Sequence, residues 1–120
     1  MSKRVAAPEQ AEEIPTNPED RSPDFIWVDL SKPVVGFDGE ITTLKLRKPT
    51  GADIIRVGNP IQFDPISDPP KISFDYPVLS KMIARLGNIA SISVEQMDPA
   101  DLVGIGWTIA PNFLPRPGTV

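Results

Sequence analysis

The carboxylates best placed to do chemistry together are Asp98 and Asp101, in the run Asp98-Pro99-Ala100-Asp101. Paired acids can act as general acid and general base. A helix start explains the same residues, because Asp98 suits an N-cap, Pro99 suits the first helical position, and Asp101 lies at the positive end of the helix dipole. We therefore interpret this pair as structural.

Three other features resemble functional motifs. Gly104-Ile105-Gly106 lacks the third glycine of a dinucleotide loop and lies inside a predicted helix rather than after a strand. The basic pair Arg47-Lys48 is typical of a solvated strand end. Trp27 and Trp107 have the size of binding hot spots, but core packing is the simpler expectation for such large apolar side chains.

Composition excludes several classes of protein. The 120 residues contain no cysteine and no histidine, so disulfides, thiolate metal sites and the commonest general base are absent. No nucleophile–base pair or metal cluster is visible, and we expect a protein that is not an enzyme, with no cofactor and no small-molecule substrate. The net charge of −4, with both signs mixed along the chain, argues against a nucleic-acid partner. No apolar run matches a membrane span or a secretory signal, so we expect an intracellular protein.

Prolines divide the chain into regions. The sequence has 15 prolines, most of them between residues 1 and 23, 60 and 77, and 111 and 117. We predict a disordered tail over residues 1–23, a single α+β domain over 24–110 and a flexible end over 111–120. A domain this small is marginally stable alone, so we expect help from a partner or from self-association.

The first part of the domain predicts an antiparallel β-hairpin over residues 24–47. Asp38-Gly39 is a strong hairpin turn signal, and Lys32-Pro33 should end or bend the first strand. Alternating apolar residues predict one buried face. On the two strands that face would hold Ile26, Val28 and Leu30, and Thr42, Leu44 and Leu46.

Three to four short helices are expected to pack against this hairpin. The first spans residues 50–57, where Thr50 and Asp53 approximate a capping box. A proline-rich excursion follows over 58–76, in which residues 71–74 could add a short edge strand. The helical part spans 77–110.

Within the helical part, the residues from Pro77 to the Gly87-Asn88 stop form the clearest amphipathic helix. Ser93 would cap a single turn. Asp98 would cap a last helix, which ends before Pro111.

The residues in this order resemble the tail assembly chaperones of contractile-tailed phages, typified by the E protein and its Mu-like equivalents. Residues 27–33, 38–41 and 44–53 resemble the N-terminal half of that family, and the run Leu-Arg-Lys-Pro-Thr-Gly-Ala-Asp at 46–53 is the most specific part. The helical part, ending in Asp98-Pro99-Ala100-Asp101-Leu102, resembles the rest. The likeness covers about residues 27–110, and the long excursion and the N-terminal tail depart from the pattern.

The resemblance implies a non-catalytic assembly factor. Such chaperones bind the phage tape measure protein and keep it soluble in the host cytoplasm, and they are not retained in the mature virion. Apolar helix residues would form the partner-binding set, by helix-in-groove packing: Met82, Leu102, Ile105, Trp107 and Ile109. The alternatives are a small structural tail or baseplate component, or a regulatory protein-binding module.

Overall fold

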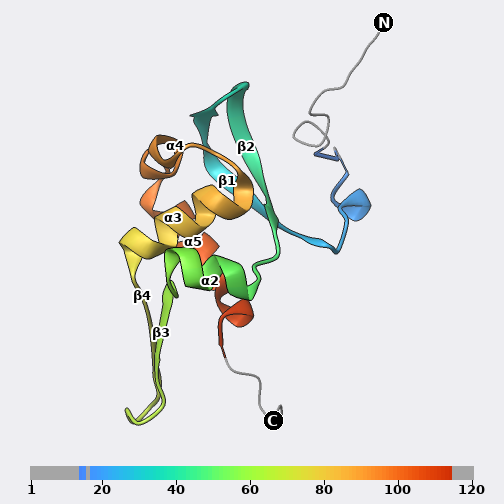
Figure 1. Cartoon of the computed structure of the whole chain (residues 1–120). Helices are drawn as coiled ribbons and strands as arrows, with labels where there is room; N and C mark the ends of the chain where they lie inside the picture. Colours follow the sequence, from blue (N-terminus) through green and yellow to red (C-terminus); the bar gives the residue numbers. More distant parts are fainter. Residues whose placement is uncertain (1–13, 16, 115–120) are drawn as a thin grey trace, which may run out of the picture.

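The computed structural model describes residues 14–15 and 17–114, and its elements form the expected α+β fold (Figure 1). In chain order they are η2 (Pro18–Asp20), β1 (Phe25–Gly36), β2 (Gly39–Arg47), α2 (Gly51–Val57), β3 (Ile61–Asp64), β4 (Lys71–Phe74), α3 (Tyr76–Gly87), α4 (Ser91–Glu95), α5 (Pro99–Ile109) and η3 (Ala110–Asn112). Among the described residues, no helix is both long and apolar enough to cross a membrane.

The first hairpin forms as the sequence predicts. β1 and β2 are antiparallel, and the pairing closes at Gly36 and Gly39. Gly39 has φ +123°, a left-handed conformation that a residue with a Cβ rarely adopts. The register shifts between Asp29 and Val34, where Pro33 was expected to disturb the strand.

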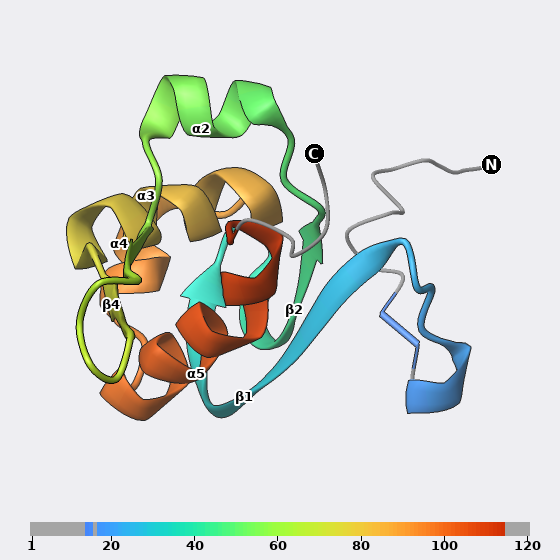
Figure 2. The same ribbon diagram turned by 90° about the horizontal axis from the view of Figure 1, so that it is seen from below.

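One face of this hairpin carries the core. Cross-strand neighbours Ile26 and Leu46, and Val28 and Leu44, share the face that packs on the helices. Helix α3 packs against β2, while α4 and α5 contact β1 (Figure 2). Each helix contributes fully or nearly fully buried side chains to that core: Leu79, Met82, Ile83, Leu86, Val94, Ile105 and Ile109.

The proline-rich excursion contains a second hairpin. The expected strand β4 pairs with β3 and not with the first hairpin, in the register Ile61–Phe74 and Phe63–Ile72. This hairpin projects away from the helices (Figure 1). Its paired apolar residues lie on one face of the hairpin, because every second side chain of a strand points to the same face.

Two of the three longer helices begin at a capping aspartate, of which Asp98 was predicted from the sequence and Asp75 was not, and α3 ends at its predicted stop. Asp75 caps α3 by accepting a hydrogen bond from the Val78 N–H at 3.3 Å, and Asn88 ends it with φ 53°. Asp98 caps α5 by accepting from the Ala100 N–H at 2.9 Å.

The prediction for Ser93 is wrong. Helix α4 begins at Ser91 instead, after Ala90. Ser93 is buried within it, and its hydroxyl donates to the carbonyl oxygen of Val35 on β1. Because the helix has already begun at Ser91, Ser93 lies inside its first turn and is not the residue that precedes the helix, so the local spacing was misleading.

Parts of both predicted ends fall outside the described residues, namely 1–13, 16 and 115–120. The described part of the predicted tail is attached to β1. The indole N–H of Trp27 donates to the carbonyl oxygen of Ser22 at 2.8 Å, and Arg21 donates to Asp29. At the other end, Phe113 is only 8% exposed, so the core includes a residue beyond the predicted boundary at 110.

Candidate functional site

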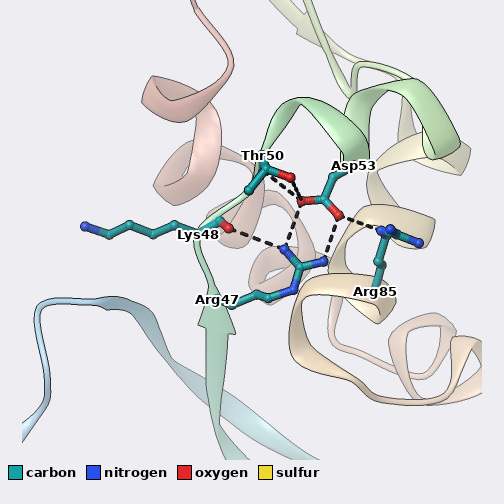
Figure 3. Close-up of polar contacts among 5 residues, drawn as sticks. All are labelled: Arg47, Lys48, Thr50, Asp53 and Arg85. Atoms are coloured by element: carbon teal, nitrogen blue, oxygen red, sulfur yellow. Dashed lines mark hydrogen bonds and ion pairs between the residues drawn. The ribbon is translucent and has the colours of Figure 1, made fainter.

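A buried carboxylate joins three elements at the end of β2. Arg47 donates to Asp53 at 2.9 and 2.7 Å, and Arg85 of α3 donates to the same carboxylate (Figure 3). The Thr50 N–H donates to it at 2.8 Å, which completes the predicted helix cap. The Asp53 side chain is only 1% exposed.

This cluster has no capacity for acid–base chemistry. Hydrogen bonding from Arg47 is the largest effect on the pKa of Asp53; together with Arg85 and Thr50 it holds that pKa far below its usual range, against the opposing effect of burial. A carboxylate that is fully engaged and hard to protonate is a poor general base. The cluster is therefore a structural clamp between β2, α2 and α3.

The Asp98–Asp101 pair is also engaged in structure. Asp98 caps α5 and lies 3.1 Å from the Lys32 ammonium, which lowers the pKa of Asp98. Asp101 accepts bonds of 3.0 Å from the N–H and hydroxyl of Ser31 and one of 3.3 Å from the Lys32 N–H. It therefore tethers the irregular part of β1 to α5, a contact beyond the helix-dipole role that the sequence suggested.

The described residues hold no group of acidic side chains that could bind a metal ion. The remaining candidate for a functional site is an apolar surface. The five predicted partner-binding residues differ widely in their exposure to solvent. Met82, Ile105 and Ile109 are fully buried in the core, and Leu102 is half-buried. Trp107 is 53% exposed, so the expectation that it packs in the core is wrong.

Trp107 belongs to an aromatic cluster that joins α5 to the second hairpin. Its ring meets Phe74 edge to face, with centroids 5.1 Å apart, and Phe74 lies 6.0 Å from Tyr76. Phe63 and Ile72 continue from Phe74 along the same face of the hairpin. The alternation of apolar residues in both strands is the sequence signal from which this extension could have been found.

The exposed side of α5 carries no charge. All residues of this helix are described, and those that face solvent are Pro99, Ala100, Val103, Gly104, Trp107 and Thr108. A Cβ added at Gly104 would meet no atom within 4 Å. An uncharged helix face beside exposed aromatic rings is a surface of the kind that binds other proteins. We call Trp107, Val103, Gly104 and Phe63 the α5–hairpin surface.

Comparison with known protein families shows a match over most of the chain. The family model described as "Phage tail assembly chaperone proteins, E, or 41 or 14" matches residues 28–113, more than two thirds of the chain. No curated protein matches, and no solved structure matches.

Proposed function

Since the chain belongs to the family of phage tail assembly chaperones, we propose that it binds the phage tape measure protein and keeps that protein soluble during tail assembly. This role requires a surface that covers apolar segments of another chain. It requires no catalytic centre, cofactor or small-molecule substrate.

The observation that carries the proposal is the exposure of Trp107 on an uncharged helix face. A half-exposed tryptophan in a soluble domain leaves apolar area in water, and binding a partner would remove that area. Packing against Phe74 holds the ring in place, so little side-chain freedom is lost on binding. Tryptophan is also the residue type most enriched among binding hot spots.

The shape of the surface favours a helical partner. Gly104 leaves room for the backbone or a large side chain of the partner to approach α5 closely. Phe63, on the projecting hairpin, offers a second apolar contact beside the helix. The partner side chains that meet this surface would be apolar, because the exposed side of α5 offers no charge to pair with an ionised group.

Co-expression with the tape measure protein encoded downstream tests the proposal. The tape measure protein should be soluble with the wild-type chaperone and should purify with it. The Trp107→Lys variant should weaken the complex at least tenfold, which corresponds to about 1.4 kcal/mol.

Ile55→Lys is the matched control, because Ile55 is an isoleucine 84% exposed on α2, away from α5. This variant should bind as the wild type does. Equal tape measure solubility with and without the chaperone would refute the proposal. Equal loss in both lysine variants would refute the assignment of the surface.

We further propose that the protein acts in the host cytoplasm and leaves the tail before the particle is complete. Mass spectrometry of purified virions provides the test. A chaperone should be absent from them, while a structural tail component would be present in stoichiometric amount.

A further inference from the structure

A groove lies beside β2 on the part of the molecule away from α5. It has a volume of about 750 Å³, and it is lined by the turn and second strand of the first hairpin, the end of α3 and the N-terminal segment. Among the described residues of the N-terminal segment, Ile14 lines the groove, and both Ile14 and Pro15 are partly buried. The segment that precedes the domain therefore reaches the groove at its last apolar residue.

The charges of the groove are separated along β2. At the hairpin turn it is lined by Asp38 and Glu40, and toward the end of β2 by Lys45, Arg47 and Arg85. The two arginines share the single carboxylate of Asp53. The Lys45 ammonium lies 4.3 Å from the centroid of Phe25 and has no carboxylate partner among the described residues. The end of the groove near Lys45 thus carries an excess of positive charge.

The residues before Ile14 carry charge in the complementary order. Lys3-Arg4 is a basic block, and Glu9, Glu12 and Glu13 form an acidic block next to Ile14. With the acidic block at Lys45, the basic block would face Asp38 and Glu40. The length also fits, because the nine residues from Arg4 to Glu12 span about 26 Å when extended, and β2 from Glu40 to Arg47 spans about 23 Å.

We propose that residues 3–13 of this chain occupy the groove beside β2, with Glu12 and Glu13 against Lys45 and Arg47. The attachment of Ser22 to Trp27 and of Arg21 to Asp29 holds the segment near the groove, so its local concentration is high. Exposed ion pairs are individually weak and are screened by salt. The segment should therefore leave the groove as salt rises.

Paramagnetic relaxation measured by NMR can test this on the full chain. Because the protein has no cysteine, a spin label on Ala11→Cys is the single label in the molecule. Amides of β2 from Thr42 to Arg47 should lose more than half of their intensity at low salt, while those of β3 and β4 keep theirs. The loss should shrink at least twofold in 0.5 M NaCl.

Charge reversal supplies the controls. Glu12→Lys with Glu13→Lys should abolish the broadening of β2, and adding Lys45→Glu should restore it. Glu19→Lys with Asp20→Lys makes the same change of charge on exposed residues of η2 and should leave the broadening intact.

Three results would overturn the proposal. These are unbroadened β2 amides, broadening that the Glu12 and Glu13 reversal does not change, and broadening that passes from labelled to unlabelled ¹⁵N protein in a mixed sample. The last would mean that a second copy, and not the chain's own segment, fills the groove. No tape measure protein is present, so the outcome does not depend on the proposed function.

Discussion

Arg47 and Asp53 form a two-pronged ion pair across the turn that joins β2 to α2, with hydrogen bonds of 2.9 and 2.7 Å. The pair fixes the position of α2 at the end of the first hairpin. Arg85 adds a third contact from α3, 32 residues away in the chain. One buried carboxylate therefore bonds to side chains or backbone from the end of β2, the start of α2 and the last turn of α3.

Replacing Asp53 by alanine should lower the free energy of unfolding by about 2–3 kcal/mol, which combines the loss of a helix cap and of charged hydrogen bonds. The two arginines are partly exposed and can turn toward water, which keeps the loss below that of a fully buried pair. Urea unfolding, monitored by circular dichroism, measures this loss of stability. As a control, Glu95→Gln changes an exposed acid, and its free energy of unfolding should stay within about 0.5 kcal/mol of wild type. An equal loss of stability in both variants would contradict the role of Asp53 as a clamp.

Arginine-to-lysine substitutions should separate the two contacts to Asp53. A lysine at position 47 cannot make two parallel hydrogen bonds, whereas a lysine at position 85 still provides the single positive charge that Arg85 offers through Nε. We expect Arg47→Lys to lower the urea midpoint more than Arg85→Lys. The opposite order would show that the α3 contact dominates.

Acid should weaken the clamp. The folded-state pKa of Asp53 is lowered, so its contribution is fully present above the ordinary aspartate pKa of about 3.9 and is lost as pH falls below that value toward the folded pKa. The difference in unfolding free energy between wild type and Asp53→Asn should therefore shrink from pH 6 to pH 2.5. Other carboxylates titrate equally in both proteins, so the difference isolates Asp53. A difference independent of pH would refute the assignment.

Local signals allowed much of the fold to be predicted. The Asp38-Gly39 turn, the Gly87-Asn88 stop, the Asp98 cap and the Thr50–Asp53 spacing act over a few residues, and each appears in the structure. Contacts between distant segments left no such signal. The bond from Arg85 to Asp53 is an example, because no spacing rule connects the two residues.

The candidate surface was harder to predict for a related reason. Almost every position of α5 is apolar or small, so helical periodicity did not distinguish its buried side from its exposed side. The side that faces the core is set by contacts with β1, among them the bond from Asp101 to Ser31. Consequently Ile105 and Ile109 are in the core while Trp107 faces solvent.

The two glycines of α5 should respond differently to replacement by alanine. At Gly104 the added Cβ meets no atom within 4 Å, so Gly104→Ala should stabilise the protein by about 1 kcal/mol through helix propensity. At Gly106 it would lie 3.3 Å from both Leu79 and Phe74, so crowding should offset that gain or reverse it. Thermal unfolding of both variants measures the contrast; equal shifts in melting temperature would contradict it.

The tether between α5 and β1 provides the last prediction. Asp101→Ala should lower the free energy of unfolding by about 1–2 kcal/mol, because the N–H groups of Ser31 and Lys32 lose their acceptor on α5. Ser31→Ala removes only the hydroxyl contact and keeps both N–H donors, so it should cost less than half as much. Hydrogen exchange should then be faster at the amides of Ser31 and Lys32 in Asp101→Ala but not at the amide of Leu44 on β2. If Ser31→Ala proves as costly as Asp101→Ala, the hydroxyl contact and not the backbone contact holds the strand.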